Sequence, residues 1–193
     1  RMREAVKPGY YRHVLREVAN IEHAQVNCLK SPVFRESEPP TDLLSFDLWT
    51  VGLASNVSLK TLSLCAGTEV TTLAKAHETI DLAFEKYGPK AIAVKDQSAY
   101  GRRLDYDDVA DEDAAPLFDK LVTDERSVSR EERKAIQDNL FRRCLRRAGE
   151  MNLPVKLHTG YYAGFGGMPL ARVRDNFSDL ATLVRDFPET KFV

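Results

Sequence analysis

A lysine and a histidine share one face of an expected β-strand near the middle of the second half of the chain. The strand covers residues 154–160. With a period of two, Val155 and Leu157 point to one face, and Lys156 and His158 point to the other. A neutral imidazole is a good ligand for Zn²⁺ and similar ions, and the end of a strand fixes its direction. His158 is therefore the best candidate for a metal ligand in the sequence.

A second lysine lies at the equivalent place on the preceding expected strand, at residues 91–99. There, Lys95 is opposed to the apolar side chains of Ile92 and Val94, so it shares the polar face of that strand. A buried lysine needs a partner or a shifted pKa, and this makes an inert role unfavourable. Lys95 is thus a candidate for contact with a substrate carboxylate or a developing oxyanion.

Strand-like and helix-like segments alternate along the chain, which is typical of a parallel α/β fold. The expected strands cover residues 21–27, 45–52, 91–99, 154–160 and 190–193. The expected helices cover residues 10–18, 70–87, 131–151 and 170–187. Ser129 and Glu132 have the spacing of a capping box at the start of the third helix. The acidic stretch at 105–113 interrupts this rhythm, and we interpret it as an exposed loop.

Composition describes an ordinary globular chain. Its 193 residues suit one domain, and 28 basic against 29 acidic residues give a net charge of -1 that does not suggest nucleic-acid binding. The three cysteines follow no metal or disulfide spacing. No apolar run reaches the roughly 18 residues of a membrane span, and no signal peptide is visible. We therefore expect a cytoplasmic location.

Four segments together resemble the amidohydrolase-related family, the metal-dependent members of the amidohydrolase superfamily that are built as (β/α)8 barrels. They read KAIAVK at 90–95, AYGR at 99–102, LPVKLHTG at 153–160 and FPETKFV at 187–193. The resemblance runs in order over essentially the whole chain but covers only the middle of such a barrel. It implies a partial (β/α)8 TIM barrel with parallel strands, with about strands 2–6 present. Residues 1–193 would then form a single, incomplete barrel domain.

The resemblance also implies roles for particular residues. His158 would bind the metal, and Lys95 would be catalytic, as a substrate or oxyanion contact or as a carboxylated bridge between two metals. Tyr100, Arg102 and Tyr161, on the loops after the two strands, would bind the substrate, since arginine suits a carboxylate. Lys156 lies deeper, where an internal ion pair and a functional role are both open.

The implied activity is hydrolysis of a C–N or C–O bond, or decarboxylation, in a small carboxylated substrate through metal-activated water. The cofactor would be a divalent metal, with zinc as the expected ion. The family's first-strand H-x-H or E-x-H pair has no counterpart here, because Ile21 and Gln25 stand two residues from His23. We therefore expect these residues alone to bind metal weakly and to show no turnover. We expect a small-molecule substrate, no nucleic acid and no membrane as partners, and we leave assembly into a homo-oligomer open.

Two other functions compete with this one. The glycine-rich loop at 160–167 could cradle a phosphate in a doubly wound domain that binds a nucleotide or cofactor, although it lacks the dinucleotide fingerprint and a G-K-[ST] motif. Alternatively, the chain could be a non-catalytic barrel segment that only associates with a partner chain.

Overall fold

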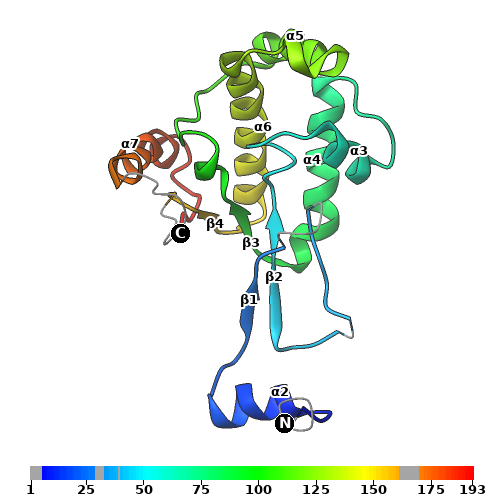
Figure 1. Cartoon of the computed structure of the whole chain (residues 1–193), viewed down its shortest axis with the longest axis vertical. Coiled ribbons are helices and arrows are strands. Elements are labelled where there is room, and N and C mark those ends of the chain that lie inside the picture. Colours follow the sequence, from blue (N-terminus) through cyan, green and yellow to red (C-terminus); the bar gives the residue numbers. More distant parts are fainter. Residues whose placement is uncertain (1–5, 29–32, 39, 161–169) are drawn as a thin grey trace.

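Four parallel strands form a single sheet whose spatial order follows the chain (Figure 1). The computed structural model describes residues 6–28, 33–38, 40–160 and 170–193. The strands are β1 (Ala24–Val26), β2 (Leu44–Trp49), β3 (Ala91–Asp96) and β4 (Val155–Leu157). A doubly wound sheet reverses its strand order, whereas a barrel adds each strand beside the last. The order β1-β2-β3-β4 is that of a barrel, which confirms the predicted fold class.

The end of the chain returns to the free edge of β4, as predicted for residues 190–193. Phe192 forms a parallel bridge with Val155. The Val155 amide donates to the carbonyl of Lys191 at 2.8 Å, and the Val193 amide donates to the carbonyl of Val155 at 2.9 Å. The predicted fifth strand, at residues 190–193, is therefore present as a single bridge to β4.

The sheet curls, and a lysine on its inner face reveals the curl. Lys156 on β4 donates to Gln25 Oε1 on β1 at 3.0 Å and lies 2.6 Å from Asp47 Oδ1 on β2. In a flat sheet, β1 and β4 would be separated by three strand spacings, or about 14 Å, with side chains standing perpendicular to the sheet. Contact between the two edge strands requires a half-barrel. Gln25, Asp47 and Lys156 are called the cross-barrel cluster below.

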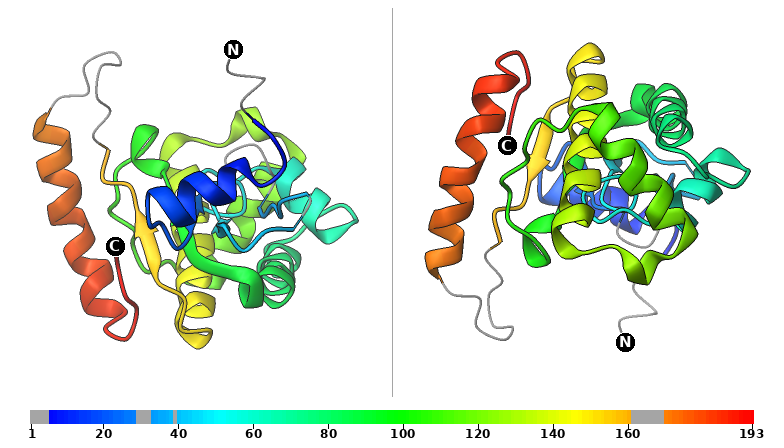
Figure 2. Two further views of the ribbon diagram at one scale, coloured as in Figure 1. Left: turned by 90° about the horizontal axis from the view of Figure 1, so that it is seen from below. Right: turned by 90° about the horizontal axis from the view of Figure 1, so that it is seen from above.

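The three longest helices lie outside the sheet and follow one another around it in chain order (Figure 2). The α-helices are α2 (Tyr10–Arg12), α3 (Leu59–Ala66), α4 (Leu73–Tyr87), α5 (Asp111–Thr123), α6 (Arg130–Glu150) and α7 (Leu170–Asp186). A π-helix η1 (His13–Val18) continues α2, and short 3-10 turns are η2 (Gly88–Lys90), η3 (Ser98–Tyr100) and η4 (Glu125–Ser127). All four predicted helices are present, while α3 and α5 were not predicted.

Local sequence determines where helix α6 begins and which of its faces is buried. The Ser129 side chain accepts from the Glu132 amide at 3.1 Å, and the Glu132 carboxylate accepts from the Ser129 amide at 2.7 Å, so the predicted capping box is present. One face of the helix is fully buried; it includes Ile136, Leu140, Cys144, Leu145 and Ala148. Capping and burial together fix α6 against the sheet.

The interpretation of the acidic stretch as a loop was wrong for its last part. Asp111, Glu112 and Asp113 form the first turn of α5. Negative side chains at this position are favoured by the partial positive charge of a helix N-terminus. Of the residues that do lie in the loop, Asp107 pairs with Lys134 of α6 at 2.7 Å. The acidic residues therefore start α5 and hold the loop before it to α6.

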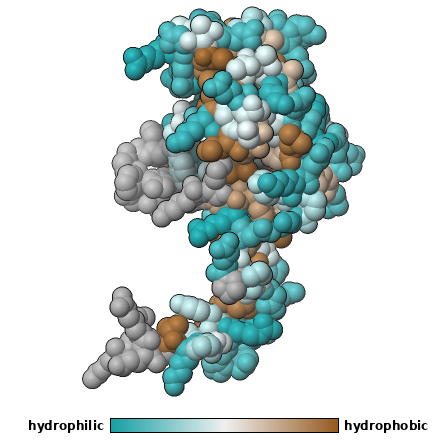
Figure 3. Space-filling view, turned by 90° about the vertical axis from the view of Figure 1, so that its right-hand side faces the viewer, coloured by the Kyte–Doolittle hydropathy of each residue, from teal (hydrophilic) through white to brown (hydrophobic). Residues whose placement is uncertain are grey.

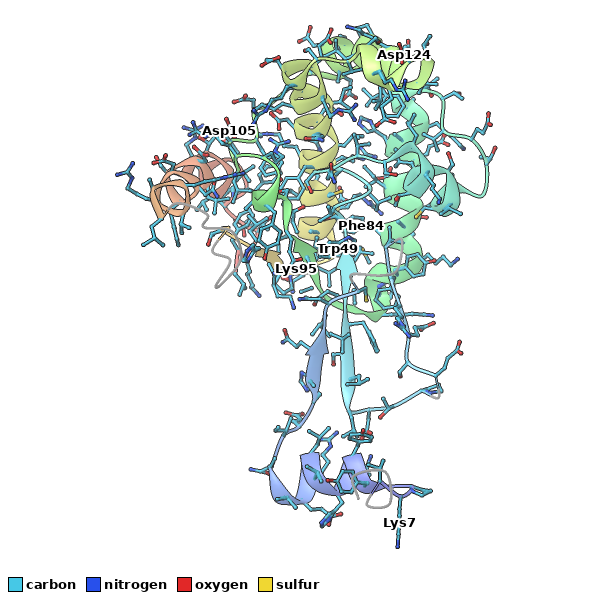
Figure 4. The ribbon with its side chains drawn as sticks, in the orientation of Figure 1. Lys7, Trp49, Phe84, Lys95, Asp105 and Asp124 are labelled. Carbon is cyan, nitrogen blue, oxygen red and sulfur yellow. The ribbon has the colours of Figure 1, made fainter. Side chains whose placement is uncertain are left out.

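The core lies between the outer face of the sheet and the helices. Leu48, Val94 and Val155 are adjacent in register on β2, β3 and β4, and all three are fully buried. They belong to one cluster with Phe84 of α4 and Leu140 of α6, and Figure 4 shows Phe84 beside the sheet. This confirms that Val155 faces the helices, so its neighbours in sequence face the barrel interior.

The N-terminal segment projects from the body at the amino ends of β1 and β2 (Figure 3). Arg12 and Arg16 hold it to Asp42 through ion pairs of 2.8 and 3.1 Å. In the described ranges, no helix is long and apolar enough to cross a membrane.

Candidate metal and substrate site

The inner face of the sheet gathers polar and aromatic side chains near the carboxyl ends of the strands. Trp49 is in register with Lys95, and Lys95 is in register with Lys156. Figure 4 shows Trp49 and Lys95 side by side at the upper ends of β2 and β3. Barrel enzymes place their chemistry at this end of the strands, so the predicted residues occupy the expected place.

His158 directly follows β4, and its main chain continues the sheet. Its amide donates to the carbonyl of Asp96 at 3.0 Å. Its ring lies 4.6 Å from the ring of Tyr100, with the two planes inclined by 47°. The Nε2 atom is buried and has no hydrogen-bond partner among the described residues. A buried polar atom without a partner is uncommon, and an imidazole nitrogen in that state is suited to a metal ion.

The surroundings keep the His158 imidazole in the form that binds metals. Burial lowers the pKa of His158, the positive charge of Lys95 lowers it further, and Asp96 opposes these effects. The ring is therefore neutral at neutral pH, with an electron pair available on one nitrogen. The effect of Lys95 on His158 indicates that the two side chains lie near one another on adjacent strands.

The Lys95 side chain makes no ion pair and no hydrogen bond within the described part of the chain. Burial and the neighbouring Lys156 lower its pKa, while Asp47 and Asp96 raise it. Asp47 is fully buried, and its carboxylate is held by Lys156 at 2.6 Å. Lys156 thus forms the internal ion pair that was one of its two predicted roles. This pair leaves the Lys95 amine available to a ligand.

A cavity of about 670 Å³ lies near Lys95 and His158, between the segments that follow β2 and β3 and the start of α6. Trp49 and Tyr100 line it, and these are the residues that lie next to Lys95 and His158. Lys95 and His158 themselves are not in the lining. The two aromatic side chains therefore connect the cavity to the pair at the strand ends.

The structure places the other predicted substrate residues differently. Tyr100 contacts His158 and lines the cavity. Arg102 also lines the cavity, but its guanidinium contacts Asp138 and Gln137 of α6 and stacks 4.1 Å from the centre of the Tyr106 ring. Tyr161, and the glycine-rich loop beyond residue 160, lie outside the described residues. The structure thus brings together His158, Lys95 and Tyr100, and it directs the guanidinium of Arg102 toward α6.

Two buried aspartates near the site were missed by the sequence reasoning. Asp47 and Asp96 are both fully buried, on the inner face of β2 and the outer face of β3 respectively. A single carboxylate inside an apolar strand is itself a signal, because a buried charge needs a partner. Asp47 sits in such a context between Phe46 and Leu48, so period-two reading could have assigned it to the barrel interior.

The described residues hold no group of three or more His, Cys, Asp and Glu side chains arranged to bind a metal. His158 is the candidate ligand that its geometry supports. A catalytic zinc site uses about three protein ligands.

Comparison with known proteins decides the family. A sequence profile of the amidohydrolase family matches residues 74–193, which is more than half of the chain. The chain belongs to the amidohydrolase family. A comparison with curated proteins finds no match.

The fold of the amidohydrolase chain is similar to that of a uronate isomerase from Thermotoga maritima. The two share 12% sequence identity with a TM-score of 0.55, and the match covers 92% of this chain and 50% of the other. At this identity the likeness concerns the fold alone. The chain spans half the length of the isomerase, in keeping with a half-barrel, and the predicted amidohydrolase resemblance is confirmed.

Proposed function

We propose that the chain is part of a metal-dependent hydrolase, with His158 as one of its metal ligands. The proposal rests on the Nε2 atom of His158, which is buried at the carboxyl end of a barrel strand and has no hydrogen-bond partner among the described residues. A divalent metal, with zinc as the expected ion, would act as a Lewis acid on water or on the substrate carbonyl. The remaining ligands would come from other parts of the barrel.

The residues of this chain would bind and orient the substrate. Lys95 offers an ammonium group without an ion pair among the described residues, in a half-buried position where its attraction to an anion is strong. A small substrate with a carboxylate suits this environment. The cavity lined by Trp49 and Tyr100 would hold the body of that substrate. Tyr100, Arg102 and Tyr161 remain proposed substrate contacts, and Lys95 remains the proposed catalytic residue.

Removing the metal is the direct test. We expect treatment of the native-length protein with a chelator to abolish cleavage of small carboxylated amides, lactones and esters. Adding back Zn²⁺, or another divalent ion, should restore it, because the Lewis acid is lost and regained without a change in the chain. Turnover and metal per chain would be measured together. Full activity in metal-free protein would refute the proposal, and a metal-free, inactive wild type would favour the non-catalytic segment.

Replacing Lys95 with methionine should separate substrate binding from metal binding. A charge-assisted hydrogen bond contributes about 1.5–3 kcal/mol, so KM for a carboxylated substrate should rise roughly 10- to 100-fold. Metal content should stay at the wild-type level. The matched control is Lys75→Met, because Lys75 is an exposed lysine paired with Glu78 on the outside of α4. Loss of metal from Lys95→Met, with unchanged KM, would instead identify Lys95 as part of the metal site.

A further inference from the structure

Asp96 lies at the end of β3 and is fully buried on its outer face, away from the barrel interior. Three donors surround its carboxylate. The Ser98 amide and hydroxyl donate to Oδ1 at 2.9 and 2.6 Å, and the Ser55 hydroxyl donates to Oδ2. No cation of the described residues forms an ion pair with it. Its partners are therefore the two segments that leave β2 and β3 at the mouth of the half-barrel.

The Ser98 contacts matter because Ser98 begins the η3 turn that ends at Tyr100. Both the amide and the hydroxyl of Ser98 are held by the same carboxylate oxygen, so the direction of the turn is set at its first residue. Two residues on, the Tyr100 ring rests against the His158 imidazole at 4.6 Å. The main-chain carbonyl of Asp96 accepts from the amide of His158 at 3.0 Å. Asp96 is thus linked to Tyr100 through Ser98, and to His158 through its own main-chain carbonyl.

The network is anchored to the helical layer by Tyr106. The Tyr106 hydroxyl lies 2.6 Å from the Ser98 hydroxyl, and because the latter donates to Asp96, Tyr106 is the donor in this contact. Tyr106 is fully buried, and its ring stacks on Phe141 of α6 at 4.2 Å. Its carbonyl accepts from Arg142 at 3.1 and 3.2 Å. The η3 turn is therefore fixed to the rigid body of the domain and not only to its own strand.

We propose that Asp96 is a positioning residue, which holds the η3 turn through Ser98 so that Tyr100 keeps the His158 imidazole in its metal-binding orientation. This inference deepens the proposed function and rests on it for the identity of the ligand. The orientation itself does not depend on a metal. It can be tested in metal-free protein, and so the two claims can fail separately.

The test observes the four histidines of the chain directly. In protein labelled with ¹³C at histidine Cε1, the ring current of Tyr100 displaces the His158 signal, which His158→Gln assigns by its loss. Tyr100→Leu should move this signal, and Asp96→Ala should move it in the same direction. Asp96→Asn keeps an acceptor oxygen for Ser98 and should restore most of the wild-type position. Asp81→Ala is the control, since Asp81 binds Arg143 of α6 and does not contact η3.

A second variant covers the case in which Asp96→Ala fails to fold. Ser98→Ala leaves the carboxylate in place but removes the hydroxyl link to it and to Tyr106, and it should shift the His158 signal in the same direction by less. An unchanged His158 signal in folded Asp96→Ala, or in Ser98→Ala, would overturn the proposal. So would a signal that Tyr100→Leu does not move.

Zinc titration of the native-length protein provides the other half of the experiment. If His158 binds the metal, Asp96→Ala should lower zinc affinity by about 10- to 100-fold, the usual effect of removing a group that orients a ligand. Asp81→Ala should leave affinity unchanged. A wild type that binds neither zinc nor another divalent ion, while the signal shifts occur as expected, would refute the proposed function and leave the positioning role of Asp96 standing.

Discussion

Replacing His158 with alanine should reduce turnover of the native-length enzyme by at least about 1000-fold. A catalytic metal contributes several kcal/mol of transition-state stabilisation, and each 1.36 kcal/mol is a factor of ten in rate. If His158 is a ligand, as proposed, its removal from the end of β4 should release the metal or leave it out of place. The fold should survive, because the imidazole Nε2 makes no hydrogen bond within the described residues and the backbone bond to Asp96 is kept.

Metal per chain, turnover and thermal unfolding would be measured on the same preparations. His13→Ala is the matched control, because the His13 side chain is 60% exposed and the N-terminal helix to which it belongs lies beyond the amino ends of the strands, opposite to His158. It should behave as wild type in all three measurements. Equal metal content and activity in wild type and His158→Ala would remove the central claim about this site.

Replacing Lys156 with methionine should have the largest effect on stability. Asp47 is fully buried, and Lys156 is its ion-pair partner. Removing one member of a buried pair leaves an uncompensated charge, at a cost of about 3–5 kcal/mol in the free energy of unfolding. The substitution also removes the contact with Gln25 across the interior.

Denaturant unfolding would measure this cost, and the double variant Asp47→Leu/Lys156→Met would show its origin. A well-packed apolar pair at these positions should recover most of the lost stability, because no buried charge remains. The surface control Lys75→Met should cost less than about 1 kcal/mol. A Lys156→Met variant as stable as this control would show that the ion pair with Asp47 does not determine the stability of the half-barrel.

Much of the fold could be predicted because strands and long helices carry periodic patterns. Alternation at residues 154–160 predicted correctly that Val155 faces the helices and Lys156 the interior. The strands are shorter than predicted, since pairing ends where the segments beyond them turn away. Helix α3 was missed because it has eight residues, too few for a clear period. Helix α5 was missed because charge at its N-terminus resembles the composition of a loop.

The candidate site was predictable only where one strand supplies the information. His158 and Lys95 follow from alternation and strand ends, and the contact of Tyr100 with His158 shows that the segment after β3 reaches the neighbouring strand. The guanidinium of Arg102 is directed by Asp138, which lies 36 residues away on α6. Asp47 likewise has its partner, Lys156, on another strand. Such long-range pairs leave no pattern in a single sequence.

The cross-barrel cluster bears on the direction from which a ligand would reach His158. Lys156 lies two residues before His158 on the same face, and it reaches across to β2 and β1 on the amino-terminal side of the strand ends. Its side chain and those of Asp47 and Gln25 therefore obstruct the interior below His158. In the proposed enzyme, a ligand of His158 would therefore approach from the carboxyl ends of the strands, where Trp49 and Tyr100 line the cavity.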